Sequence, residues 1–257
     1  MDTLLDARQG LLRSGARIDR EAESAPRLRV AVFGVYGGDG ADSMAAAVRR
    51  LQDTRHSVAL ALGALGGPSP QLAALTAADH MAGGKLSNLN RLAETSPPAD
   101  ADWVLLLDDD VVLPGRFLDR LVLLAERFDL QLAQPALTQT SHTAWPVTRR
   151  RPYLLRRTRF VEMGPVVLMR RQAFETLTPF PETGMGWGIC LHWAALAERE
   201  GWNVGIADAV PVRHDSRPPA LSYDREKAQA AARELLGSRE HIGWRQADAV
   251  LASYRAL

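Results

Sequence analysis

Three consecutive aspartates, Asp108-Asp109-Asp110, are the residues whose type and spacing most directly suggest chemistry. They follow the apolar run Trp103-Val104-Leu105-Leu106-Leu107 without a break. Adjacent carboxylates repel one another, so a cation is expected beside them. A hard divalent metal that also holds phosphate oxygens would meet this need most simply. The other interpretation is a solvated acidic turn at the end of a strand.

A buried strand must position these acids. A continuous run rich in Leu and Val is typical of a strand covered on both faces of a parallel sheet. Open α/β sheets place their ligands at the carboxyl ends of such strands. Strands over residues 28–35 and 57–63 with a helix between them predict a βαβ unit, and an amphipathic helix over residues 117–128 follows the acids.

Composition bounds the class of protein. The 257 residues are 46% hydrophobic and 24% charged with a net charge of +1, which favours one soluble α/β domain and no nucleic-acid partner. The single cysteine, Cys190, excludes an internal disulfide and a cysteine-based zinc site and fits a reducing compartment. No apolar run approaches the roughly 20 residues that span a bilayer, and the acidic N-terminus is unlike a secretory signal. We expect a cytoplasmic protein without a transmembrane segment; peripheral membrane contact and a homodimer stay open.

A second polar segment, Gly84-Lys85-Leu86-Ser87-Asn88, precedes the acidic strand. A helix that starts after Gly84 would point its N–H groups and dipole toward an anionic ligand. Lys85 would add a positive charge near a diphosphate, and Asn88, one turn further along the same face, is a candidate to bond to base or ribose. The alternative is a glycine turn followed by a polar helix face.

Two further markers complete the pattern. Gly186-Trp187-Gly188 opens a helix, and His214 follows the last strand region. With the aspartates and the Gly84–Asn88 segment, this layout resembles the GT-A glycosyltransferases, in particular the family 2-like branch, over about residues 28–217. The resemblance implies a single α/β domain with a mostly parallel central sheet flanked by helices.

The resemblance also implies roles for particular residues. Asp108 and Asp110 would flank a metal-bound nucleotide diphosphate sugar, with Asp109 beside it and His214 as the third protein ligand of Mn²⁺ or Mg²⁺. Carboxylate and imidazole both ligate Mn²⁺, with diphosphate oxygens completing the octahedron. Tyr36, at the end of the first strand, is a candidate to stack on the base, or else lines the site without contacting the ligand.

The acceptor side is predicted in residues 138–159, a polar, aromatic and basic stretch interpreted as a long loop. Trp145 is a candidate to stack on a sugar or planar acceptor. Arg149 begins an arginine run that suits a phosphorylated or acidic acceptor, and Trp187 would shape the same side. The alternative for this stretch is a solvated basic surface.

The sequence does not identify which residue would act as the general base. The resemblance leads us to expect an acid where Ile189 or Cys190 stands. An unperturbed thiol is largely protonated at neutral pH, so Cys190 is a poor base, and we favour a buried helix residue over a nucleophile. The substitutes for the missing acid are Glu182, His192 and Asp215. A retaining enzyme needs no such base, so the stereochemistry stays open.

The predicted organisation has four parts. They are a helical extension over 1–25, a nucleotide-sugar-binding half over 26–137, an acceptor-side half over 138–220, and C-terminal helices over 221–257. The last helix is predicted to carry Ala247, Val250, Leu251 and Tyr254.

The predicted function is that of a metal-dependent glycosyltransferase of the hexosyltransferase type. It would move a sugar from a UDP- or GDP-linked donor to a hydroxyl of a small molecule or glycan. One alternative is a non-catalytic nucleotide- or glycan-binding module with the same fold. A sugar-phosphate nucleotidyltransferase is the other, and it is disfavoured because the first glycine-rich loop lacks the basic signature of such enzymes.

Overall fold

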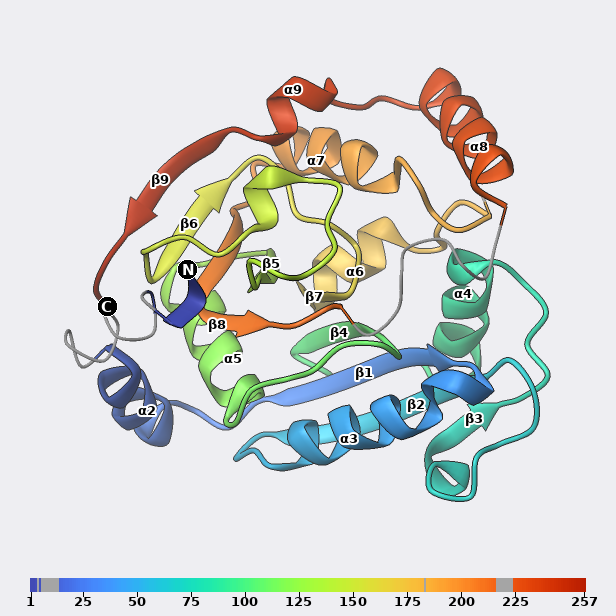
Figure 1. Cartoon of the computed structure of the whole chain (residues 1–257), viewed down its shortest axis with the longest axis horizontal. Coiled ribbons are helices and arrows are strands. Elements are labelled where there is room, and N and C mark those ends of the chain that lie inside the picture. Colours follow the sequence, from blue (N-terminus) through green and yellow to red (C-terminus); the bar gives the residue numbers. More distant parts are fainter. Residues whose placement is uncertain (4, 6–13, 183, 216–223) are drawn as a thin grey trace.

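The computed structural model describes residues 1–3, 5, 14–182, 184–215 and 224–257, and these build a nine-stranded sheet (Figure 1). The strand order is β3-β2-β1-β4-β7-β5-β8-β6-β9. The strands are β1 (Arg29–Tyr36), β2 (Ser57–Ala64), β3 (Thr76–Ala78), β4 (Trp103–Asp108), β5 (Leu132–Leu137), β6 (Leu155–Thr158), β7 (Val166–Arg170), β8 (Val204–Val212) and β9 (Val250–Tyr254). Only β6 and β7 run opposite to the other strands, which confirms the predicted α/β class with a mostly parallel central sheet.

Helices flank this sheet. They are α2 (Ser14–Ser24), α3 (Ala41–Gln52), α4 (Lys85–Thr95), α5 (Phe117–Arg127), α6 (Arg171–Leu177), α7 (Ile189–Arg199), α8 (Arg225–Ser238) and α9 (Trp244–Ala247). Sequence signals explain several helix ends. Gly201 adopts the left-handed conformation (φ +67°) just after α7, and the Asp224 side chain caps α8 by accepting the N–H groups of Glu226 and Lys227. Within the described chain, no helix combines the length and the apolar character needed to cross a membrane.

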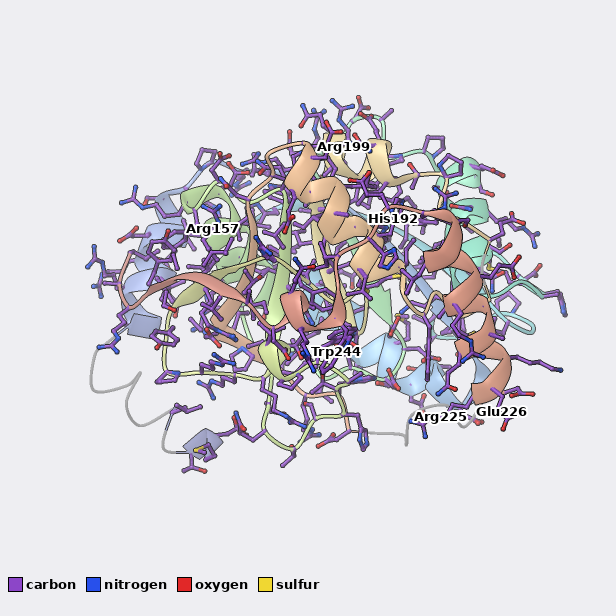
Figure 2. All side chains as sticks on the ribbon, turned by 90° about the horizontal axis from the view of Figure 1, so that it is seen from above. Arg157, His192, Arg199, Arg225, Glu226 and Trp244 are labelled. Carbon is purple, nitrogen blue, oxygen red and sulfur yellow. The ribbon has the colours of Figure 1, made fainter. Side chains whose placement is uncertain are left out.

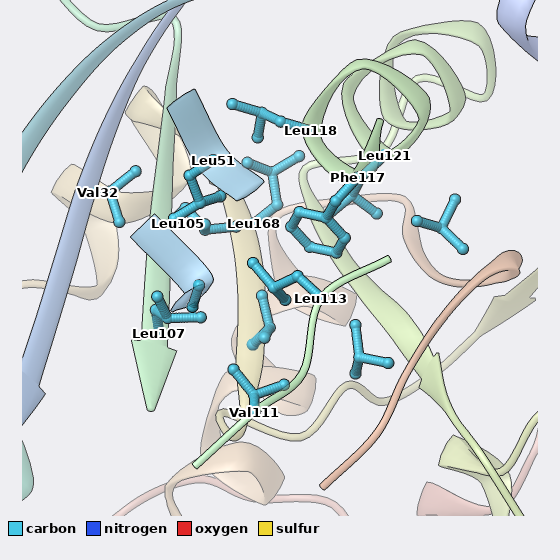
Figure 3. Packing of buried hydrophobic residues seen from close by; sticks show 14 of the residues in the cluster. Val32, Leu51, Leu105, Leu107, Val111, Leu113, Phe117, Leu118, Leu121 and Leu168 are labelled. Atoms are coloured by element: carbon cyan, nitrogen blue, oxygen red, sulfur yellow. The ribbon is translucent and has the colours of Figure 1, made fainter. Parts of the chain in front are cut away.

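The side chains of β4 are buried on both faces of the sheet, which is why its sequence is a continuous apolar run. Leu105 and Leu107 face α3 and α5, where they meet Leu51, Phe117 and Leu121 (Figure 3). The alternate residues of β4, Val104 and Leu106, belong to a second cluster with residues of α4, α6 and α7. These two hydrophobic layers fix the strand whose carboxyl end carries the aspartates.

Two predictions about secondary structure were wrong. Residues 250–254 form the edge strand β9 rather than a final helix, because they pair antiparallel with β6. The predicted loop over 138–159 contains β6 itself, which also pairs with β8. The predicted helical extension over 1–25 includes α2. Residues 216–223, which span the predicted boundary between the acceptor-side half and the C-terminal helices, lie outside the described residues.

A buried ion pair ties β6 to β8 and anchors the preceding loop. Arg156 and Asp208 both have side chains that are 0% exposed, and the guanidinium donates to both carboxylate oxygens at 2.7 and 2.9 Å. The same guanidinium donates to the backbone oxygens of Val147 and Arg149, and the N–H of Arg151 donates to Asp208. The hydrogen bonds that the pair makes to other residues therefore hold residues 147–151 against the sheet.

We predict that Arg156→Met destabilises the fold by about 3–5 kcal/mol, because it leaves the Asp208 carboxylate buried without its partner. Urea unfolding followed by circular dichroism measures the change. The control is Arg17→Met, which removes an exposed i,i+4 pair with Glu21 and should stay within about 0.5 kcal/mol of the parent. Equal midpoints for the two variants would show that the buried pair contributes little.

Candidate active site

The acidic turn lies where five segments of the chain meet. Asp108 ends β4 directly opposite Val35 of β1 in the parallel register, so the loop after β1 sits beside the acids. The N–H of Asp108 donates to the backbone oxygen of Pro165 at 2.8 Å, which brings the segment before β7 to the same place. The amino end of α4 and the segment after β8 complete the group. The site is thus built at the carboxyl end of the parallel strands, as predicted.

Asp108 forms an ion pair with Lys85, the first residue of α4. The Lys85 Nζ lies 2.5 Å from Asp108 Oδ1, and both side chains are partly buried. Burial disfavours the charged form of Lys85, but the Asp108 carboxylate outweighs it and holds the pKa of Lys85 above its ordinary value. Gly164 packs against this pair, since a Cβ there would lie 2.7 Å from Asp108 Oδ2 and 3.0 Å from Lys85 Nζ. The close approach requires glycine.

Asp109 joins the acidic turn to the glycine-rich loop after β1. Its Oδ2 accepts the backbone N–H of Gly37 at 2.9 Å. A Cβ on Gly40 would come within 1.8 Å of the same oxygen, so no larger residue fits at that position. The glycines of this loop therefore let the backbone approach a carboxylate of the protein.

Asp110 meets His214, as the resemblance implied. The His214 Nε2 lies 3.2 Å from Asp110 Oδ1. Burial lowers the pKa of His214, but the hydrogen bond and charge of Asp110 more than offset this, so the pKa is raised. The loop after β5 holds the His214 backbone, because the Ser141 hydroxyl accepts its N–H and its carbonyl accepts the His142 N–H. Among the described residues, the buried Nδ1 of His214 finds no hydrogen-bond partner.

Glu162 is a site residue that the sequence analysis missed. Burial raises the pKa of its carboxyl to about 7, although nearby His214, Lys85 and the Thr143 hydroxyl act in the opposite direction. Its Oε2 accepts a hydrogen bond from Thr143 at 3.3 Å. The available signal was a single carboxylate, between Val161 and Met163, inside an otherwise apolar stretch.

Cys190 lies beside Glu162 and is buried. Its Sγ accepts the backbone N–H of Met163 at 3.1 Å, and burial raises the pKa of the thiol to about 12. A thiol with that pKa stays protonated at neutral pH and is neither a base nor a nucleophile. The structure agrees with the interpretation of Cys190 as a buried helix residue.

The three substitutes for the missing acid lie apart from one another. Glu182 is exposed on the segment before α7. His192 is buried in α7 (Figure 2). Its Nδ1 pairs with the backbone oxygen of Glu240. Asp215 pairs with Arg213 and accepts the Thr140 hydroxyl near the end of β8. Only Asp215 is close in sequence to a residue of the acidic site, and it is already engaged.

The structure places the residues predicted to bind the nucleotide differently. Lys85 reaches the acids, but the Tyr36 ring is only 2% exposed and its hydroxyl bonds to Thr76 and Ser69. A base has no ring face to stack on there, so the structure argues against stacking by Tyr36, which belongs to the hydrophobic core. Asn88 is 5% exposed and donates to the backbone oxygen of Gly83, which supports the turn before α4.

The predicted acceptor-side residues are more structural than expected. Trp145 is half-buried and packs on Phe160 with ring centroids 4.6 Å apart. The Arg149 guanidinium donates to backbone oxygens of Gln139 and Ser141, so it folds the loop back on itself. Trp187 is half-buried in the turn that opens α7. Gly184, which lies shortly before α7, is close to the start of α4. A Cβ added to Gly84 would come within 2.1 Å of the Gly184 backbone oxygen.

The donor set suits a divalent metal without forming a closed cage. Within the described ranges, no three His, Cys, Asp or Glu side chains gather closely enough to hold a metal by themselves. Mg²⁺ and similar ions bound with a nucleotide need only one or two carboxylates, because phosphates and water supply the rest. Asp110 and His214 offer an oxygen and a nitrogen 3.2 Å apart, next to Asp108, and these donors match Mn²⁺.

Two surface hollows lie away from this chemistry. One, of about 380 Å³, is lined by residues such as Gln131, Arg170 and Trp202 at the amino end of the parallel strands. The other, of about 300 Å³, lies beside His192 and Trp193 of α7. Ligands of open α/β sheets bind at the opposite, carboxyl end, so the acids remain the candidate active site.

Comparison with known proteins gives a similarity of fold. No protein-family model matches this chain. No curated protein matches it in sequence. Mannosyltransferase PcManGT from Pyrobaculum calidifontis, in complex with GDP-Man and Mn²⁺, is similar with a TM-score of 0.61 at 15% identity, over 96% of this chain and 78% of that one. GalNAc-T7 with UDP, GalNAc and Mn²⁺ is similar with a TM-score of 0.59 at 11% identity, over 82% of this chain and 48% of that one.

These similarities confirm that the chain has the GT-A fold implied by its sequence. At identities of 15% and 11% the likeness concerns the fold. Membership of the family 2-like branch stays a prediction, and the activity must be argued from the site.

We predict that Gly164→Ala weakens Mn²⁺-dependent binding of GDP or UDP by about 10- to 100-fold, because the new methyl group displaces Asp108 and Lys85. Isothermal titration calorimetry with the nucleotide that binds the parent protein measures the loss. Gly115→Ala is the matched control, since a Cβ there meets nothing within 4 Å. Unchanged affinity in Gly164→Ala would show that the Lys85–Asp108 pair does not contribute to the nucleotide site.

Proposed function

We propose that this chain is a metal-dependent glycosyltransferase that uses a UDP- or GDP-linked sugar. The observation that carries the proposal is the convergence of Asp110 and His214, 3.2 Å apart, with the Lys85–Asp108 pair on the same acidic turn of a GT-A fold. These residues supply the donors for a cation and a positive charge for a diphosphate. The structurally similar PcManGT and GalNAc-T7 were solved with Mn²⁺ and with GDP-Man or with UDP and GalNAc, which supports the same class of ligand.

The proposal gives the residues of the acidic site different roles. Asp108, Asp110 and His214 hold the cation, Mn²⁺ or Mg²⁺, which when bound neutralises the charge that develops on the departing diphosphate. Lys85 binds a diphosphate oxygen, and this requires its ammonium group to be shared with Asp108. Asp109 keeps the turn in place through the Gly37 N–H. We retain a hexose donor, a hydroxyl acceptor on a small molecule or glycan, and a cytoplasmic location as parts of the proposal.

A non-catalytic binding module is the second candidate. The observation in its favour is Cys190, a protonated thiol at the position where the resemblance leads us to expect an acid. Such a module would bind the nucleotide with Mn²⁺ but would consume no donor. Calorimetry together with an assay of donor consumption separates the two candidates.

We predict that Asp110→Ala lowers Mn²⁺-dependent hydrolysis of the donor sugar by at least about 100-fold, since it removes both a ligand of the cation and the partner of His214. UDP- and GDP-sugars are first screened by thermal shift with Mn²⁺, because a bound ligand raises the melting temperature. Release of UDP or GDP from the best donor is then measured. The control is Asp100→Ala, an exposed aspartate before β4. Turnover that survives in Asp110→Ala contradicts the assignment of the aspartates.

A further inference from the structure

The segment that carries Glu162 is held by three different parts of the fold, one of which contacts its carboxylate. Its backbone N–H donates to the side-chain oxygen of Gln134 on β5 at 2.7 Å. Its Oε2 accepts the Thr143 hydroxyl from the loop after β5. The next residue, Met163, donates its N–H to Cys190 Sγ at the start of α7. These contacts fix the backbone of the segment and one oxygen of the Glu162 carboxylate.

The acids themselves lie next to the same segment. Gly164, two residues after Glu162, packs directly on Asp108 and Lys85. The ionisable groups that act on Glu162 come from four elements: Lys85 from α4, Asp108 from β4, Cys190 from α7 and His214 after β8. Glu162 is therefore a carboxyl group on the acceptor-side segment of the proposed site, separate from the three aspartates.

Glu162 also stands beside the residue that occupies the expected position of the acid. Cys190 is at that position and its thiol stays protonated, but the backbone bond from Met163 brings the Glu162 segment against it. The segment before β7 thus supplies a carboxyl group near the position at which α7 lacks an acid. Glu182 is exposed, and Asp215 is bound to Arg213, so neither is placed in this way.

We propose that Glu162 is the general base of the proposed glycosyl transfer and removes the proton from the acceptor hydroxyl. The inference rests on the proposed function. The acceptor oxygen forms a bond to the anomeric carbon of the donor sugar as the bond from that carbon to the diphosphate oxygen breaks. The hydroxyl proton passes to the Glu162 carboxylate, and the electron pair of the broken bond leaves with the diphosphate. This single displacement inverts the anomeric configuration.

The pH dependence follows from the environment of Glu162. Burial raises the pKa of its carboxyl to about 7, which is close to the value that suits a general base near neutral pH. A base must be deprotonated, so the rate falls about tenfold per pH unit below that pKa and levels off above it. The rate of donor hydrolysis by the wild-type protein, with water as the acceptor, should show this fall at acidic pH, which is the acidic limb of its pH profile.

The experiment compares two nucleophiles in Glu162→Gln with Mn²⁺ and the UDP- or GDP-sugar selected by thermal shift. Water must lose a proton to react, but azide ion carries none. We expect hydrolysis to fall at least about 100-fold and to lose its acidic pH limb, whereas azide still forms the glycosyl azide at a rate near that of the parent. The configuration of the glycosyl azide, read by NMR, should be inverted relative to the donor.

Each other outcome overturns the proposal. Hydrolysis unchanged in Glu162→Gln shows that another group takes the proton. Loss of both reactions shows that Glu162 has a positioning or structural role. Calorimetry then tells whether the variant still binds the donor. Retained configuration excludes the single displacement. A wild-type protein that consumes no donor rejects the proposed function itself, which distinguishes the two failures. The matched control is Glu94→Gln, an exposed glutamate of α4, for which we expect parent rates with both nucleophiles.

Discussion

The structure depends on keeping three adjacent carboxylates together at the end of one buried strand. Two like charges about 4 Å apart repel by roughly 4 kcal/mol at an effective dielectric constant of 20, so each carboxylate requires its own compensation. Each has a different partner: Lys85 for Asp108, the Gly37 N–H for Asp109 and His214 for Asp110. The partners come from the start of α4, the loop after β1 and the segment after β8. One acidic turn therefore brings distant parts of the chain to one place.

The fold was largely predictable because its main signals are local. The apolar run before the aspartates predicted β4, and helical periodicity predicted α3 and α5, since burial of these elements requires those patterns. The end of the chain was not predictable in this way. Residues 250–254 are a strand because β6 offers them an edge to pair with, and that edge is formed by a segment which itself looked like a loop. Pairing partners distant in sequence decided the outcome over local preference.

The site was predictable in part. The sequence indicated Asp108–Asp110, Lys85 and His214, and the structure brings them together. It did not show where Arg149 would point, because a guanidinium is satisfied by backbone oxygens as well as by an acidic ligand, and the folded loop supplies them. Glu162 escaped notice for a related reason. A carboxylate in an apolar stretch has no spacing that marks it as functional, and its significance arises from desolvation beside Cys190 in the folded chain.

The charges around the acidic turn also bear on how the diphosphate of the proposed donor would be bound. Lys85 is already paired with Asp108, and the raised pKa of His214 depends on the charge of Asp110. A diphosphate brings further negative charge to a turn that carries three carboxylates, and Lys85 with His214 provides at most two positive charges. Binding through these side chains alone would leave like charges close together in a partly desolvated site. A divalent cation, which Asp108, Asp110 and His214 would hold, would offset that repulsion, so the charge balance of the acidic turn supports the proposed metal-dependent mode of binding.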